Sequence, residues 1–520
     1  MPRKLHGRYH GARPGLICGV VALLVYLATC MPGVGWQDSG IHQYRILTGW
    51  LENPRGLALS HPVHYWLGRG LLAVPLPLGE PAYRLNLLSV LAGAAGVGLL
   101  AATVAAVSRR LSAAYLAAAV LLVAHIYWQM SVTTEVYAVD VALLTLEWYL
   151  LWRFISGGSP WFIVAVFAVN GLHVANHLFG LLALVPYVLL ALQRVWRRQL
   201  AVRWLLAGAL AWLVTCTPYW ALVLAYYVRT GDIATTLRST FFGGSERGGG
   251  WADDVLNVGL PLGHLKIVVL TLGYNFPSLV LPIGLAGVLR PTRGRGRAFR
   301  WVLIGQTLIM GGFLVRYTVP DIHTFFMPIC ALVALWFGLG VDRLLNGIRG
   351  QRTRRWVVGL LALNAAIPPV VYAVFPEVAR QRGWMRSRMR DIAHRDEYAH
   401  FFRPWRGGDD SPAVFAREAL DRIAPAGWLL AEDTTAYTTA YTYWVHGGPP
   451  DVRIYGDRTC LNLSGRPYLS DTELAEFLAV GGQVVVVPGE VTERIWGGRF
   501  VLDRSRNDFW LVHPERPPQD

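Results

Sequence analysis

Residues 84–107, RLNLLSVLAGAAGVGLLAATVAAV, decide the fold class of this chain. Beyond Arg84 the stretch carries no charged residue, and its polar residues are few and small. A bilayer core requires about 20 apolar residues of α-helix. The stretch therefore predicts a transmembrane helix.

The same pattern recurs along most of the chain. The 520 residues are 54% hydrophobic and 16% charged, with a mean hydropathy of +0.37, whereas soluble domains carry roughly 25% charged residues. The predicted spans are 15–32, 84–107, 111–128, 135–154, 160–175, 177–193, 204–228, 264–289, 301–317, 323–341 and 356–375. We therefore predict an all-α polytopic membrane bundle of about 11 helices in residues 1–375.

The arginines set the orientation of this bundle. With the N-terminus in the cytoplasm, the inner loops hold Arg109 and Arg110, Arg153, and the arginines within 194–203, 290–300 and 343–355. This agrees with the positive-inside rule. The start of the chain is interpreted as an uncleaved first helix, because many spans follow it. Three larger pieces then face outward: 33–83, 229–263 and the chain after about 376.

The net charge of +15 does not indicate nucleic acid, because the basic residues cluster between apolar runs rather than forming one stripe. The five cysteines have neither CxxC nor metal-ligand spacing. The sequence therefore predicts no nucleic-acid partner, no disulfide framework and no zinc site.

After residue 376 the composition becomes that of a soluble protein. WLLAE, DVRIY, QVVVVPG and FWLVHP are typical of strands. Ser470 and Glu473 form a capping box that predicts a helix through Val480. We expect residues 376–520 to form a small extracytoplasmic α/β domain. Within the first outer loop, residues 61–78 predict a helix lying along the membrane surface.

The string GVGWQDSGIHQYRI follows the first span and places Asp38 where the chain leaves the membrane. A carboxylate there can act as a base toward an acceptor hydroxyl or can ligate a metal. It can equally be a helix cap or a solvated loop acid.

The string MSVTTEVYAVD brings Glu135 and Asp140 to the start of the fourth span. Ionisable residues inside a span are costly and point to function. Glu135 also suits a helix N-terminus, and Asp140 could pair with an arginine.

In NGLHVANHLFG, His173 and His177 are four residues apart and share a helix face. The spacing permits metal binding, but no acidic third ligand is nearby in the sequence. We interpret both as satisfied polar residues of the bundle.

The string FLVRYTVPDIHTFFMP forms a short outer loop with Arg316, Asp321 and His323. Arginine outside the membrane runs against the positive-inside bias, and Arg45, Arg55, Arg69 and Arg84 do the same in the first loop. A phosphate at the outer interface would explain them, as would ion pairs with outer acids.

Taken in order, several strings resemble a known family. They are WQDSG, ALSHPVHYWLGR, RLNLLS, TTEVYAVD, NGLHVANHLFGLLALVP and YTVPDIHTFFMP, covering roughly residues 30–340, and LLAEDTTAYTTAYTYWVHGGPPDVRIY in the tail. The chain resembles bacterial multi-pass proteins related to the animal transmembrane protein O-mannosyltransferases, within the GT-C glycosyltransferase superfamily. The resemblance implies a GT-C-like membrane domain.

The resemblance also implies a function: transfer of a sugar from a polyprenyl-phosphate donor to a protein or glycan acceptor on the outer face of a cell (inner) membrane. Mannose is the sugar that the family suggests. Asp38 matches the essential acid of the first outer loop, and Glu135 matches a second acid near the site. The positions that match family motifs or face the same side, and are expected to bind substrate, are His61, Arg69, Arg84, Asn86, Tyr137, Arg316, Asp321 and His323. Arg84 and Arg316 are the residues that we expect to hold the lipid phosphate.

One position departs from the family pattern. The usual string is DSGE, and this chain has Ile41 in place of the glutamate. If that acid takes part in catalysis or metal binding, His42 or Glu135 must replace it, or the substrate differs. The sequence offers no complete ligand set for a divalent metal, and metal use is left open. The alternatives to a transferase are a transporter or flippase of a lipid-linked or polar solute, which would favour an internal inverted repeat, and a scaffold protein.

Overall fold

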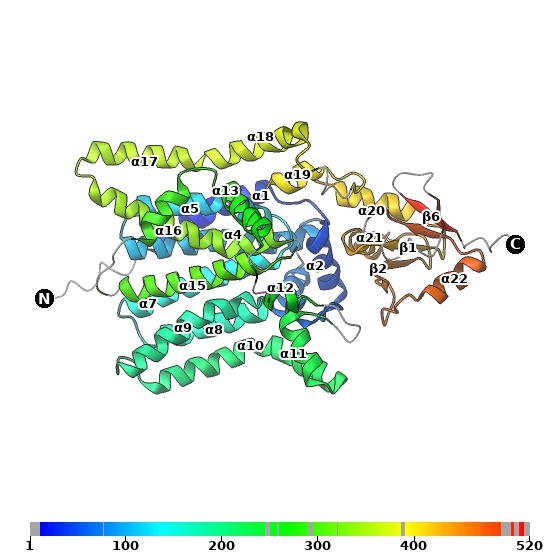
Figure 1. Ribbon diagram of the computed structural model, residues 1–520, viewed down its shortest axis with the longest axis horizontal. Helices are drawn as coiled ribbons and strands as arrows, with labels where there is room; N and C mark the ends of the chain where they lie inside the picture. Colours follow the sequence, from blue (N-terminus) through cyan, green and yellow to red (C-terminus); the bar gives the residue numbers. More distant parts are fainter. Residues whose placement is uncertain are drawn as a thin grey trace.

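The structure, a computed structural model (Figure 1), describes residues 11–513 apart from 76, 245–249, 257, 258, 260, 290–293, 295, 320, 386–390, 490–500 and 504–508. Part of the predicted outer loop 229–263 and three arginines of the inner loop at 290–300 therefore lie outside the described residues.

Every predicted span coincides with helical structure. The bundle helices are α1 Ala12–Ala28, α4 Pro81–Ser108, α5 Leu111–Val123, α6 His125–Ser131, α7 Val136–Ile155, α8 Trp161–Asn176, α9 Phe179–Trp196, α10 Val202–Thr230, α13 Leu262–Asn275, α14 Val280–Val288, α15 Gly296–Arg316, α16 Met327–Gly347, α17 Gln351–Ala365 and α18 Ile367–Arg382. Among the described residues, six helices are long and apolar enough to cross a membrane, or up to eight if the bent pairs α5/α6 and α13/α14 each count as one span.

This count is lower than the predicted eleven because three of the predicted spans are too short or carry too many ionisable residues. The apolar helices α1 and α8 are short, with 17 and 16 residues, and α7 carries three ionisable residues, Asp140, Glu147 and Arg153. Length and composition alone therefore do not identify these three helices as spans.

Small residues let the bundle helices approach closely. A Cβ atom at Gly15 of α1 would lie 2.9 Å from the carbonyl oxygen of Gly98 in α4, and a Cβ at Gly98 would lie 2.8 Å from the Gly15 oxygen. Such backbone contacts between helices are typical of packing in lipid, where small side chains allow van der Waals contact along the helices.

Short elements connect the bundle on the side of the C-terminal domain. They are α2 Gln37–Thr48, η1 Leu57–Leu59, α3 Pro62–Ala73, α11 Ile233–Phe242, α12 Ala252–Leu256 and η2 Ile322–Phe326. The predicted surface helix 61–78 is observed as α3, and it exposes Trp66 and Leu67.

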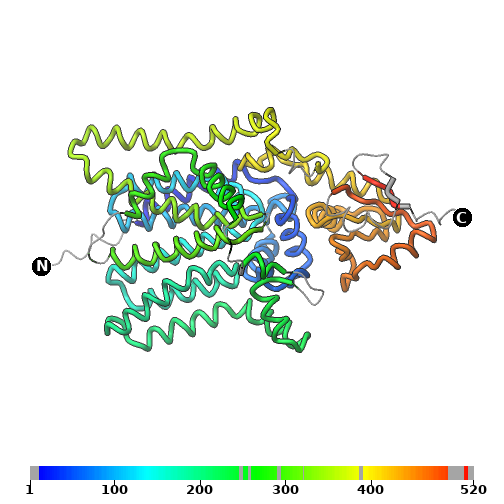
Figure 2. The backbone as a smooth tube through the Cα atoms, viewed as in Figure 1, coloured from blue at the N-terminus to red at the C-terminus, as the bar shows by residue number. Residues whose placement is uncertain are grey.

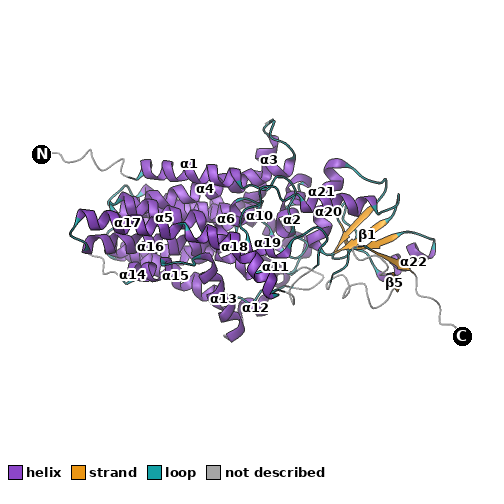
Figure 3. Ribbon diagram, turned by 90° about the horizontal axis from the view of Figure 1, so that it is seen from above, coloured by secondary structure: helices purple, strands orange, loops and turns teal. Residues whose placement is uncertain are grey.

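The C-terminal part is a small α/β unit (Figure 3). Its elements are α19 Glu397–Phe402, α20 Ser411–Asp421, β1 Trp428–Ala431, α21 Asp433–His446, β2 Arg453–Gly456, β3 Thr459–Cys460, α22 Asp471–Ala479, β4 Val484–Val486, β5 Val501–Asp503 and β6 Trp510–His513. The sheet order is β3-β2-β1-β4-β6-β5, with β1 parallel to β2 and β4 and with β6 antiparallel to β4 and β5. The four predicted strands and the capping box of Ser470 and Glu473 are confirmed.

One hydrophobic core joins this unit to the bundle side. Trp36 and Tyr44, from the segment between α1 and α3, belong to the same buried cluster as Phe415 of α20, Tyr441 of α21 and Ile454 of β2. Burying apolar side chains from both parts in one core holds the unit against α2. The backbone trace accordingly shows the C-terminal unit seated on the bundle (Figure 2), with α1 beginning on the far side of the bundle from it.

Candidate active site between the bundle and the C-terminal unit

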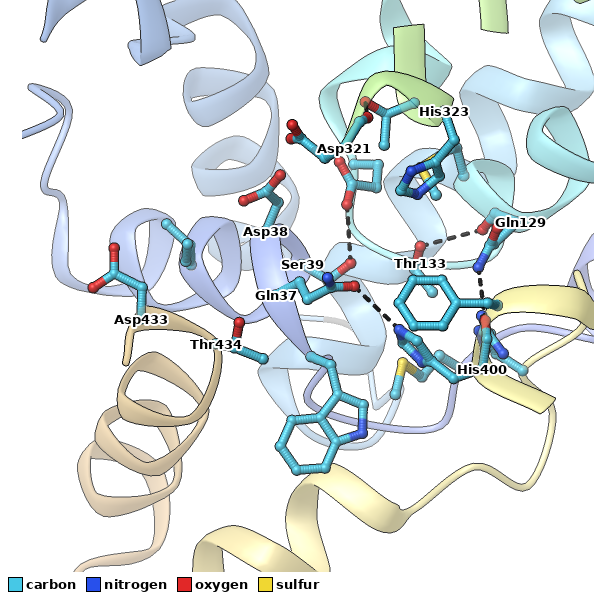
Figure 4. A pocket seen from close by; sticks show the side chains of 18 of the residues that line it. Gln37, Asp38, Ser39, Gln129, Thr133, Asp321, His323, His400, Asp433 and Thr434 are labelled. Carbon is cyan, nitrogen blue, oxygen red and sulfur yellow. Dashed lines mark hydrogen bonds between the residues drawn. The ribbon is translucent and has the colours of Figure 1, made fainter. Parts of the chain in front are cut away.

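A cavity of about 350 Å³ lies where the bundle meets the C-terminal unit (Figure 4). Four of the predicted site residues line it: Asp38, Glu135, Asp321 and His323. They come from α2, from the residue before α7 and from the start of η2, so more than 280 positions of sequence separate the first from the last. The structure thus brings together both predicted catalytic acids.

Helix α2 presents Asp38 to the cavity. Asp38 lies in the first turn of α2, where the helix dipole stabilises a carboxylate. The preceding residue, Gln37, has a left-handed φ of 53°, which is costly for a residue with a side chain. Strained backbone of this kind is concentrated at functional sites, where surrounding structure holds it in place. Figure 4 shows Asp38 beside Asp321 and Ser39.

Glu135 occupies the N-cap position of α7 and is 5% exposed. The Ser39 hydroxyl donates to Glu135 Oε1 at 3.3 Å, and the Glu135 backbone N–H donates to Ser89 Oγ at 3.1 Å. Ser39 follows Asp38 directly in α2. Its hydrogen bond therefore holds the Glu135 side chain against the helical turn that carries Asp38.

Asn86 acts behind this pair rather than in the cavity. Its side-chain amide donates to the carbonyls of Met31 and Gly33, both at 2.9 Å, while its Oδ1 accepts from Gln43 and Thr134 at 2.9 and 2.6 Å. This buried network joins α4 to Gln43 of α2, to the segment before α2 and to Thr134, the residue before Glu135. A fully satisfied buried network rigidifies its surroundings, so Asn86 holds these segments together.

Arg316 lines a second cavity of about 450 Å³ between α13, α15 and α16. The other residues of this groove are mainly apolar, among them Leu272, Leu308, Val315 and Phe326. Because Asp321 and Thr324 line the first cavity and Phe326 lines the second, the segment 321–326 separates the two. Arg316 and the carboxylates are therefore placed on neighbouring sites, not in one.

The remaining predicted substrate-binding residues lie outside the first cavity. His61 contacts the Asn176 carbonyl through Nδ1 at 2.8 Å and stacks on His177, which packs against Tyr137. Arg69 is exposed.

Arg84 also lies outside the cavity. Its guanidinium donates to the carbonyls of Leu71, Leu72 and Val74 at the end of α3. Arginine is favourable at a helix C-terminus because it satisfies the last carbonyls and opposes the negative end of the dipole. The sequence predicts that Arg84 holds a phosphate, whereas in the structure its guanidinium binds these backbone carbonyls.

His173 and His177 differ in their surroundings. His173 contacts Asp140 through Nε2 at 2.7 Å and Glu147 through Nδ1 at 2.9 Å, and all three side chains are fully buried between α7 and α8. The backbone N–H of Phe179 donates to His177 Nδ1. The prediction that these histidines are satisfied residues of the bundle is confirmed, and the partner of Asp140 is a histidine rather than an arginine.

The sequence does not predict that the C-terminal unit forms one side of the cavity. Five charged residues of this unit line it: Arg406, Asp409, Glu432, Asp433 and Asp457. The tail string LLAEDTTAY contains two of these acids at the end of β1, where side chains often reach a site. No sequence signal connects that string to Asp38, which is about 400 positions away.

Arg55 joins the two halves of the site. Its guanidinium is 2.5 Å from Asp433 and also pairs with Asp457. Burial raises the pKa of Asp433 to about 7, against the opposing effect of Arg55 and with the help of nearby carboxylates. Burial lowers the pKa of Arg406 to about 10, because it disfavours the charged guanidinium.

Ile41 lines the same cavity, at the position where the resembled family has an acid. Glu135 shares that cavity, whereas His42 turns to the Tyr65 hydroxyl at 2.9 Å. Among the residues that the structure describes, no three His, Cys, Asp or Glu side chains converge as metal ligands.

Part of the chain is similar to known proteins. Residues 60–200 match the model of the protein O-mannosyl-transferase TMEM260 N-terminal domain. The chain is 30% identical over 245 residues to mouse protein O-mannosyl-transferase TMEM260, which covers 44% of this chain and 33% of the mouse protein. The family resemblance inferred from the sequence is thereby confirmed. The chain spans about a third of the length of this curated relative.

Two solved structures share the fold. ArnT from Cupriavidus metallidurans bound to undecaprenyl phosphate superposes with a TM-score of 0.58 at 16% identity, over 96% of this chain and 97% of that one. The archaeal oligosaccharyltransferase AglB from Archaeoglobus fulgidus, in complex with an inhibitory peptide and a dolichol-phosphate, has a TM-score of 0.51 at 14% identity, over 91% of this chain and 69% of that one. The predicted GT-C-like fold is confirmed, with helices in a membrane domain and a small C-terminal sheet.

Proposed function

We propose that this chain is a membrane glycosyltransferase that moves a sugar from a polyprenyl-phosphate donor to a hydroxyl of a protein acceptor on the outer face of the membrane. One observation carries the proposal: Asp38 and Glu135 converge on one cavity beside a mainly apolar cavity that Arg316 helps to line. Mannose is the sugar favoured by the TMEM260 match.

The two cavities suit the two parts of such a donor. The apolar groove accommodates a polyprenyl chain, since its lining from α13, α15 and α16 offers side chains that gain from burial. Arg316 at its edge can donate two parallel hydrogen bonds to a phosphate. The sugar then extends past η2 into the first cavity, toward Asp38.

The reaction needs few groups. As the acceptor oxygen bonds to the anomeric carbon, its proton passes to the Asp38 carboxylate, and the bond from that carbon to the phosphate oxygen breaks with its electron pair leaving on the phosphate. Attack on the face opposite the phosphate inverts the anomeric centre. Negative charge grows on the leaving phosphate, so a guanidinium held beside it lowers the barrier. Glu135 is placed to orient the acceptor or sugar hydroxyls.

Relatives with this fold support a lipid-linked donor. The ArnT structure holds undecaprenyl phosphate, and the AglB structure holds a dolichol-phosphate. We also infer that the membrane is the cell (inner) membrane, with the N-terminus cytoplasmic and the C-terminal unit extracytoplasmic, because the basic loops lie on the side of the N-terminus.

The test is Asp38→Asn in the full chain, reconstituted with radiolabelled polyprenyl-phosphate mannose and an acceptor extract. Loss of a general base lowers rates by about 100-fold or more, and we expect that loss in transfer with donor binding retained. Asp421→Asn, which removes an exposed acid at the end of α20, is the matched control and should keep wild-type transfer.

Transfer that survives in Asp38→Asn would overturn the role of Asp38. A wild-type protein that neither transfers nor hydrolyses any polyprenyl-phosphate sugar would contradict the proposal and favour the transporter or flippase alternative.

A further inference from the structure

The turn between α9 and α10 concentrates positive charge at the end of the bundle away from the C-terminal unit (Figure 1). Four arginines stand within ten positions there: Arg194, Arg197, Arg198 and Arg203. The sequence has no Asp or Glu between Glu147 and Asp232. Helices α8, α9 and α10 therefore carry no carboxylate that could offset this charge.

Three of these guanidiniums have no ion pair or hydrogen bond within the part of the chain that the structure describes. They belong to Arg197, Arg198 and Arg203, the last of which lies over the Trp204 ring at 5.5 Å from its centroid. The fourth, Arg194, donates to Gln199 Oε1 at 2.8 Å. The donors of the first three are therefore available to a bound group.

Arginines near other turns at the same end of the bundle have protein partners. Arg110 pairs with Asp342 at 3.2 Å, and Arg300 donates to the Val288 carbonyl at 3.1 Å. The turn between α9 and α10 differs from these places, because its guanidiniums converge without an acceptor from the chain.

Tryptophans surround the same turn. Trp196, directly before Arg197, is 89% exposed. Trp161 at the start of α8 meets Trp204 of α10 edge to face, with ring centroids 4.9 Å apart. Tryptophan is enriched at the headgroup level of a membrane, where one side of the indole is apolar and the other is wet.

Apolar side chains continue from the turn along both helices. Leu189 and Leu192 of α9 and Leu206 and Leu210 of α10 are exposed, and both helices are long and apolar enough to cross a membrane. The hairpin thus presents leucines, then tryptophans, then arginines. A phospholipid has the matching order of acyl chains, glycerol region and phosphate, whereas a free phosphate would match only the arginines.

We propose that the turn between α9 and α10 binds an anionic phospholipid, with its phosphate at Arg197, Arg198 and Arg203 and its acyl chains along Leu192 and Leu206. Guanidiniums donate paired hydrogen bonds to phosphate oxygens. Each basic residue beside a membrane span raises the affinity for anionic lipid by about fivefold. A zwitterionic headgroup gains less, because its own cation is repelled by the arginines. This site lies at the far end of the bundle from the proposed active site and does not depend on sugar transfer.

The test measures lipid binding directly. The full chain in a neutral detergent is titrated with phosphatidylglycerol or with phosphatidylcholine of the same acyl chains, and the first bound lipid is followed by native mass spectrometry. We expect phosphatidylglycerol to bind at least about fivefold more tightly. A large excess of inorganic phosphate should leave the lipid bound, because the acyl chains contribute to its affinity.

Variants assign the preference to this turn. Arg197→Gln combined with Arg198→Gln should reduce the preference for phosphatidylglycerol by at least about threefold, and so should Arg203→Gln on its own. The matched control is Arg417→Gln, which removes an exposed arginine of α20 in the C-terminal unit and should leave the preference unchanged. The two sets of variants are independent, so misfolding of one does not decide the result.

Three outcomes would overturn the proposal: equal binding of the two lipids, an unchanged preference in both sets of variants, or displacement of phosphatidylglycerol by inorganic phosphate. The last outcome would indicate a site for a free anion instead.

Discussion

The charged residues of this chain lie in very different surroundings. Asp38 lies at the dipole-stabilised start of a helix, Asp140 and Glu147 share one buried histidine, and Asp433 shares Arg55 with Asp457. A carboxylate can thus face a cavity, lie in a buried core or link the two parts of the chain electrostatically, according to its burial and its neighbours.

Asp433 gives the stability of the folded chain a pH dependence. Its pKa is raised to about 7, first by burial and then by Asp457, Asp38 and Glu432, with Arg55 opposing. Burial disfavours the ionised carboxyl, so we expect the Tm of the full chain to fall as pH rises from 5 to 8. Asp433→Asn should flatten this dependence, as measured by thermal unfolding at both pH values.

The sign of this change follows from the direction of the pKa shift. A carboxyl with a higher pKa in the folded protein than its ordinary 3.8 holds its proton more tightly when folded, so its ionisation lowers stability as pH rises between those values. A wild-type chain whose Tm changes between pH 5 and pH 8 no more than that of Asp433→Asn would contradict the assigned pKa.

At the scale of elements, α2 and α21 pack together where the C-terminal unit meets the bundle. Thr438 of α21 donates to the Gly35 carbonyl at 2.9 Å, just before α2, and the Tyr44 hydroxyl of α2 donates to the Leu461 carbonyl. The hydroxyl of Tyr441 in α21 accepts from the Ala82 N–H of α4 at 2.7 Å. Each of these contacts joins the C-terminal unit to the helix that carries Asp38 or to its neighbour.

Gly40 permits this docking. A Cβ atom there would lie 2.6 Å from the Gly35 carbonyl oxygen and 2.9 Å from Thr438 Oγ1, so Gly40→Ala must displace backbone. Overpacking of this kind costs about 1–3 kcal/mol, and we expect a lower Tm together with reduced sugar transfer, because α2 moves with Asp38.

The matched control is Gly70→Ala in α3. A Cβ atom at Gly70 meets nothing within 4 Å, and alanine favours a helix by about 1 kcal/mol over glycine. This variant should keep wild-type Tm or exceed it slightly. A Gly40→Ala chain with the Tm and activity of Gly70→Ala would show that the α2–α21 contact tolerates a methyl group.

In the whole molecule, the apolar helices and the C-terminal unit follow one another along the long axis. The C-terminal unit lies at one end of that axis, and the apolar helices extend from it toward the other end, where α1 begins (Figures 1 and 3). Arginine-rich connections such as 109–110 join helices at the N-terminal end. This arrangement agrees with a membrane that crosses the bundle and leaves the cavity on the side of the C-terminal unit.

Cysteine labelling tests that topology. All five native cysteines are buried and free, so the wild-type chain should react little. Ser464→Cys, exposed in the C-terminal unit, should react in intact spheroplasts with a maleimide that cannot cross membranes. Ser159→Cys, exposed between α7 and α8, should react only after the cells are opened. The reverse pattern would place the active site on the cytoplasmic face.

The sequence determined the parts of this protein that depend on local pattern. The apolar runs predicted the positions of the helices, because a bilayer leaves the backbone no alternative to internal hydrogen bonding. The box of Ser470 and Glu473 predicted α22 for a similarly local reason, since the cap needs residues only three positions apart. The family strings then singled out Asp38 and Glu135.

Only the tertiary structure decided which residues meet. It brought Asp38, Glu135 and Asp321 to one cavity and directed Arg84 to the end of α3. It also placed Asp433 against Arg55 across nearly 380 residues of chain. Contacts of that kind depend on how helices and domains pack, and packing is a property of whole surfaces rather than of residue spacing.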